Sequence, residues 1–199
     1  MKKLLYCAAG AALIFAACQK ENNVSEKILN IQASFEETTQ TKATINDNGV
    51  FGWVKGDLIG IYNGSGFNKL TAQSSGKSVN FYGTVLGDPQ SCAVYPYGSC
   101  DGTGSVKLPA TYEWVENQVN TPMYAEYDPD GLSFRHLGGL FKVHIVNVPA
   151  TASEMVLKTN KDITGTYEII SGEIKSAGKA ENNSVTFTFT AGKSSDMTF

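Results

Sequence analysis

The clearest pattern in this chain is an alternation of apolar and polar residues between positions 29 and 36. Successive side chains of an extended chain point to opposite faces, so a period of two predicts a strand with one buried face. A similar alternation runs through residues 185–190. The apolar members of the first alternation are Leu29, Ile31, Ala33 and Phe35.

Short extended runs continue along the chain, and turn residues separate them. Asn46–Gly49 has the composition of a hairpin turn, and no stretch of twelve residues after position 18 shows a helical period. The sequence therefore predicts an all-β fold of two sandwich modules, residues 28–130 and an incomplete module 131–199, divided at Asp128–Gly131. The last residues, Asp196–Phe199, resemble the start of another strand, so we expect a truncated chain. Strands are expected at Val50–Val54, Leu58–Tyr62, Val79–Val85, Ala93–Tyr97, Val106–Leu108, Leu140–Val148, Glu154–Lys158, Thr166–Ile170 and Val185–Thr190.

Composition narrows the possible functions. The 199 residues carry 16 Lys+Arg against 19 Asp+Glu, and the formal net charge is −3. Binding to nucleic acid through a basic face needs a surplus of cations, so no nucleic-acid partner is expected. A hydrophobic content of 42% is enough for a packed core.

The first residues have the pattern of an export signal. Lys2 and Lys3 precede the apolar run Leu4–Ala17, which is shorter than the roughly 20 residues that a membrane-spanning helix needs. The run ends in Phe15-Ala16-Ala17-Cys18, which resembles a bacterial lipobox. We therefore expect a signal peptide at 1–17, a lipid such as palmitate on Cys18 and a polar tether at 18–27. An ordinary secretory signal cut after Ala17 is the alternative.

Removal of the signal peptide leaves one pair of cysteines beside Cys18. Cys92 and Cys100 would lie in an oxidising compartment, which favours a disulfide. An extended run after Cys92 carries the two apart unless Pro96 and Gly98 reverse the chain. The sequence leaves open whether Cys92 and Cys100 are bridged.

Sequence motifs for catalysis are missing. The chain has no G-x-S-x-G elbow, and Gly76-Lys77-Ser78 lacks the first glycine of a phosphate-binding loop. Glu126–Gly131 begins like a calcium loop, but position 137, where that loop needs an acid, is Leu. His136 and His144 would lie about 26 Å apart in one straight strand, which is too far to share a metal. We therefore expect no catalytic residue, metal or cofactor, and no enzyme.

The two tryptophans have different surroundings in the sequence. Trp53 lies in an apolar run and is expected in the core. Trp114 has polar neighbours and is expected to be a loop aromatic that covers the end of the sandwich. The alternative is that Trp114, with Tyr112, offers a surface on which a sugar ring could stack.

An ordered set of motifs resembles the fimbrillin family, the type V pilin subunits and their surface-lipoprotein relatives. The set begins with the lipobox and the strand that ends in Thr41–Thr44, and its strongest part is a W-x-x-G-D-x-I-G-x-Y string. Later members are Ala93–Tyr97, Leu108–Thr111 and Phe134–Leu137 leading into Phe141–Val143. The string is carried by Trp53, Gly56, Asp57, Ile59, Gly60 and Tyr62.

The resemblance implies two transthyretin-like β-sandwich modules in a lipoprotein on the cell outer membrane. It also implies that a protease removes the first strand and that a strand of another fimbrial subunit fills the groove, in a fimbrium that supports adhesion. Leu29, Ile31, Ala33 and Phe35 would form the exchangeable strand. Lys42 would be the processing site, where the family commonly has Arg. The partners would be other fimbrial subunits, the outer membrane through the lipid and a host or glycan receptor. The alternative is a monomeric surface glycan-binding lipoprotein.

Overall fold

The computed structural model describes residues 25–36, 44–45, 51–101, 104–115, 122–137, 143–170 and 173–198. The protein is all-β, as the sequence predicts, and the one helical element in these ranges is a 3-10 turn at Tyr97–Ser99. Among the described residues, no helix is long and apolar enough to cross a membrane.

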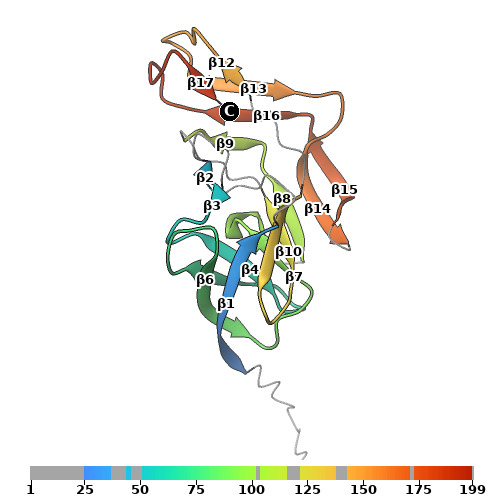
Figure 1. Ribbon diagram of the computed structural model, residues 1–199. Coiled ribbons are helices and arrows are strands. Elements are labelled where there is room, and N and C mark those ends of the chain that lie inside the picture. Colours follow the sequence, from blue (N-terminus) through green and yellow to red (C-terminus); the bar gives the residue numbers. More distant parts are fainter. Residues whose placement is uncertain are drawn as a thin grey trace, which may run out of the picture.

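Seven strands close into a barrel, which forms the lower part of the molecule in Figure 1. Strand β1 lies between β6 and β11, antiparallel to β6 and parallel to β11. The barrel therefore closes through the first strand of the described chain. In spatial order the strands are β1 (Glu26–Phe35), β11 (Leu132–His136), β10 (Met123–Glu126), β7 (Cys92–Tyr95), β4 (Leu58–Tyr62), β5 (Phe67–Ala72) and β6 (Val79–Leu86).

Smaller sheets form the rest of the structure. One joins β13 (Glu154–Lys158), β16 (Ser184–Thr188) and β9 (Thr111–Glu113), and a second joins β15 (Glu173–Asn182), β14 (Thr164–Ile170) and β8 (Ser105–Leu108). The others pair β12 (His144–Ile145) with β17 (Met197–Thr198), and β2 (Thr44–Ile45) with β3 (Phe51–Gly52). The sheets that contain β12, β13 and β16, which we call the upper sheets, lie at the end of the molecule opposite the start of β1 (Figure 1).

The barrel continues past the predicted module boundary at residues 130 and 131. The turn Asp128–Gly131 joins β10 to β11, which are antiparallel neighbours in the barrel. In addition, β8 and β9 precede this turn in sequence but pair with β14 and β16, which follow it. A turn signal shows that the chain reverses and does not show which sheet the next strand joins.

The barrel core is built from the inward faces of its strands. Trp53 is 1% exposed, and its indole Nε1 donates a hydrogen bond to the Ala33 carbonyl oxygen at 3.1 Å. The prediction that Trp53 lies in the core is confirmed. Four aromatic rings surround the indole at centroid distances of 4.5 to 5.3 Å, those of Phe35, Phe81, Tyr95 and Phe134.

Candidate functional site

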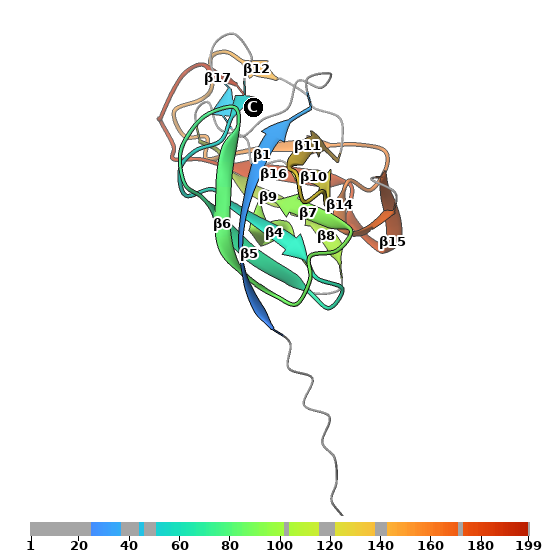
Figure 2. The same ribbon diagram turned by 60° about the horizontal axis from the view of Figure 1, so that its bottom comes forward.

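Strand β1 supplies backbone pairing on both of its edges. Its residues 26–33 pair with β6 from Glu26↔Leu86 to Ala33↔Val79. Its last three residues pair with β11 from Ala33↔Leu132 to Phe35↔Phe134. Figure 2 shows β1 and β6 side by side along the wall of the barrel. Without β1, the backbones of β6 and β11 would both be unpaired edges, which readily accept another strand.

The inward face of β1 is the face that the alternation predicts. Ile31 is 3% exposed and Ala33 is fully buried. Leu29 and Phe35 are partly buried and pack against the same core. Each large apolar side chain that is fully buried contributes about 1.5–3 kcal/mol, so this face holds the strand in the barrel.

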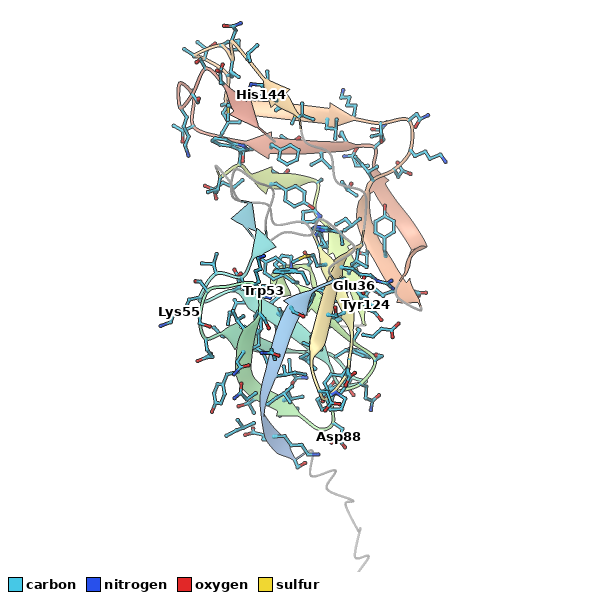
Figure 3. All side chains as sticks on the ribbon, viewed as in Figure 1. Glu36, Trp53, Lys55, Asp88, Tyr124 and His144 are labelled. Carbon is cyan, nitrogen blue, oxygen red and sulfur yellow. The ribbon has the colours of Figure 1, made fainter. Side chains whose placement is uncertain are left out.

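Weaker contacts hold the start of β1. The Lys27 ammonium pairs with the Asp88 carboxylate, and both side chains are more than half exposed. The Gly87 amide donates to the Ser25 carbonyl oxygen at 2.9 Å. Figure 3 shows Asp88 near the start of β1 and Trp53 near its end. An exposed ion pair contributes at most about 1 kcal/mol, so the inward face and the backbone pairing retain the strand.

The G-D step of the W-x-x-G-D string is a tight turn. Gly56 has φ +94°, and the Asp57 amide donates to the Val54 carbonyl oxygen at 2.9 Å. The Asp57 carboxylate accepts from the Val54 amide at 2.8 Å and from the Tyr95 hydroxyl at 3.5 Å. Burial raises the pKa of the Asp57 carboxyl, and the two hydrogen bonds oppose that rise. The turn directs the chain from Trp53 into β4.

Cys92 and Cys100 are free thiols, so the disulfide that the sequence left open is not formed in this structure. The Cys100 sulfur lies over Gly60, where a Cβ atom would collide with it. Burial raises the pKa of Cys92 to about 11. Burial, together with the charge of Cys92, raises the pKa of Cys100 to about 12. Both thiols are therefore protonated and poorly reactive at neutral pH.

The aromatic surface that the sequence offered for a sugar ring is covered. Trp114 is 8% exposed, and the Lys193 ammonium lies 5.1 Å from the centre of its ring. The Tyr112 ring stacks on Phe187 at 5.7 Å. The burial agrees with the expectation that Trp114 is a covering aromatic, and the pairing of β9 with β16 joins this segment to the β13–β16 sheet.

One cavity of about 570 Å³ lies between the outer face of the barrel and the β8–β14 sheet. Its acidic side chains are Glu126 and Glu168, and Tyr62, Tyr124 and Tyr127 supply its aromatic rings. Sequence reasoning did not find this cavity, because it depends on pairing between β8 and β14 across a long stretch of chain.

Cys18 and Lys42 lie outside the described residues. In the described ranges, no group of three or more His, Cys, Asp or Glu side chains is arranged to hold a metal ion. The candidate functional site is β1 with the surfaces around it. The chain matches no protein-family model, no curated protein and no solved structure.

Proposed function

We propose that this chain is a structural or accessory subunit of a cell-surface fimbrium, which assembles by protease-triggered β-strand exchange and supports adhesion. In this proposal the chain is exported as a lipoprotein of the outer membrane, anchored through Cys18. One observation carries the proposal: β1, near the N-terminal end of the chain, is a complete strand of a closed barrel, with a core-facing apolar row and two hydrogen-bonded neighbours.

Cleavage after Lys42 would separate β1 covalently from every other strand. Lys42 is the one basic residue between Lys27 and Lys55, and it follows β1 and precedes β2 in the chain. Loss of β1 would expose an apolar groove over Trp53, flanked by the free edges of β6 and β11. An extended segment of another subunit would fill it by β-augmentation, with backbone bonds for affinity and alternate side chains for specificity.

The strength of the inward face explains why exchange would need a competing strand. Ile31 is buried and contributes about 1.5–3 kcal/mol, and the partly buried Leu29 and Phe35 each add less, before the cost of ordering the segment. A cleaved β1 would therefore remain bound in the barrel until another strand displaced it. Ala33 is fully buried, and its carbonyl oxygen accepts the hydrogen bond from the Trp53 indole. The incoming strand would therefore need a small residue at that position.

The same proposal assigns the parts of the fold to the modules of the family. We infer that the barrel and the upper sheets correspond to the two transthyretin-like modules of the fimbrillin family. The ordered set of family motifs supports this correspondence. In the described structure, the Trp53 string lies within the barrel and the Phe134 motif lies in β11.

Limited digestion with a trypsin-like protease tests this function. We expect the wild-type chain to lose the residues up to Lys42, to gain a new N-terminus at Ala43 and to form SDS-resistant oligomers with full-length partners. Lys42→Gln should remain an intact monomer, because the exchange cannot begin. N-terminal sequencing and gel electrophoresis without boiling measure both results.

Lys55→Gln is the matched control, because Lys55 is an exposed lysine on the turn after Trp53. It should process and oligomerise like the wild type. A wild-type chain that stays an intact monomer after digestion would count against strand exchange, and so would oligomers that form equally from Lys42→Gln.

A further inference from the structure

The outer face of β1 and β6 carries an exposed apolar cluster that the barrel core does not use. Ile28 is 71% exposed, Tyr82 is 47% exposed and Leu86 is 45% exposed. Soluble proteins expose single apolar side chains routinely, but groups of them mark contact surfaces. We call these three residues the outer cluster.

The strand register makes the outer cluster continuous. Ile28 is paired with Thr84, and Tyr82 and Leu86 stand two residues to either side of Thr84 on the same face of β6. Diagonal neighbours on one face of an antiparallel pair lie close enough for long side chains to touch. The cluster therefore spans both strands at the end of the barrel where β1 begins (Figure 2).

The sequence places the predicted lipid anchor close to this cluster. Residues 19–25 separate Cys18 from Glu26. At about 3.5 Å per residue, a fully extended chain of this length reaches about 28 Å. A lipid on Cys18 would thus hold the start of β1 within about 28 Å of the membrane. The upper sheets lie at the other end of the molecule (Figure 1).

We propose that the outer cluster docks the barrel wall on the lipid surface next to the anchor, an inference that rests on the Cys18 lipid in the proposed function. Three side chains are few for a stable protein interface, which buries roughly 800 Å² on each partner. A contact that is held in place by an anchor needs less buried area, because the anchor raises the effective concentration of the membrane. Tyr82 suits this role, since tyrosine prefers the boundary between lipid and water.

The charges around the start of β1 indicate whether the membrane contact is electrostatic or apolar. Glu26, Lys27 and Asp88 surround the start of β1 and together carry one net negative charge. Lys27 is already paired with Asp88. Anionic lipids would therefore not strengthen the contact, and the apolar side chains would carry it. Displacement of β1 after cleavage at Lys42 would remove the lipid and Ile28 together, which would release the subunit from both attachments at once.

Vesicles of phosphatidylcholine with a nickel-chelating lipid test the docking. A hexahistidine sequence in place of residues 1–18 would tie the chain at the same point, whether or not cells acylate Cys18. An environment-sensitive dye on Ile28→Cys is compared with the same dye on Val156→Cys. Val156 is 43% exposed on β13, in the upper sheets. The dye should label these sites selectively, because burial raises the pKa of both native thiols.

We expect brominated phosphatidylcholine to quench the dye at position 28 and to leave the dye at 156 unquenched. Equal quenching at the two positions would overturn the docking proposal. It would also be overturned if the untethered chain self-associates in sedimentation and Ile28→Asp abolishes the association, because the outer cluster would then seat a second copy. The digestion at Lys42 tests strand exchange without a membrane, and the vesicle experiment tests docking without cleavage. Either proposal can therefore fail while the other holds.

Discussion

Replacing Ile31 by aspartate is expected to unfold the barrel, whereas the same replacement at Ile28 should leave its stability nearly unchanged. The two residues lie on one strand, but Ile31 is 3% exposed and Ile28 is 71% exposed. At position 31 the change removes a buried side chain and places a carboxylate in the core, for which we expect a cost above about 4 kcal/mol. At position 28 the carboxylate stays in water, and a surface change is usually worth less than about 0.5 kcal/mol.

Urea unfolding followed by circular dichroism measures both variants. Both lose a β-branched residue that favours strands, so strand propensity changes equally and the difference reports burial. Similar losses at both positions, or a folded barrel with Ile31→Asp at the wild-type urea midpoint, would contradict the packing of β1 against the core.

Replacing Trp53 by alanine is expected to be the most costly single truncation in the barrel. Loss of a buried tryptophan usually costs about 3–5 kcal/mol. In this protein it also removes the indole donor from the Ala33 carbonyl, and leaving a buried acceptor unsatisfied costs about 1–3 kcal/mol more. The same urea titration measures the loss as a lower unfolding midpoint.

Tyr82→Ala is the matched control for this truncation, because it removes a large aromatic side chain from the same barrel at an exposed position. It should cost about 1 kcal/mol or less. If the two truncations cost the same, the core would not be centred on Trp53.

Local patterns in the sequence predict much of the fold. The alternation at 29–36 places β1 and its buried face correctly. Strands Leu58–Tyr62 and Glu154–Lys158 have the predicted bounds. Asn46–Gly49 lies between β2 and β3, which pair as a hairpin, although the turn residues themselves lie outside the described ranges. Each of these features depends on neighbours in the chain.

Features that depend on distant residues could not be predicted in this way. Closure of the barrel requires β11 to pair in parallel with β1, about a hundred residues earlier in the chain, and no local pattern specifies that partner. Strands β5, β9, β10, β11 and β15 were not predicted, because they are short or because polar residues interrupt their apolar positions. The sequence did contain a signal for the outer cluster: Ile28 and Leu29 are adjacent apolar residues in one strand, so one of them must face outward.

Exchange of the first strand is tested most directly by a labelled peptide with the sequence of residues 25–36. After the chain is cut at Lys42, we expect this peptide to enter the barrel slowly and to displace the native strand, which fluorescence anisotropy and gel filtration can follow. A peptide with Ile31→Asp should not enter, because its carboxylate would have to be buried. Entry of the native peptide alone is the predicted result. A cut chain that accepts neither peptide, or accepts both equally, would contradict the account.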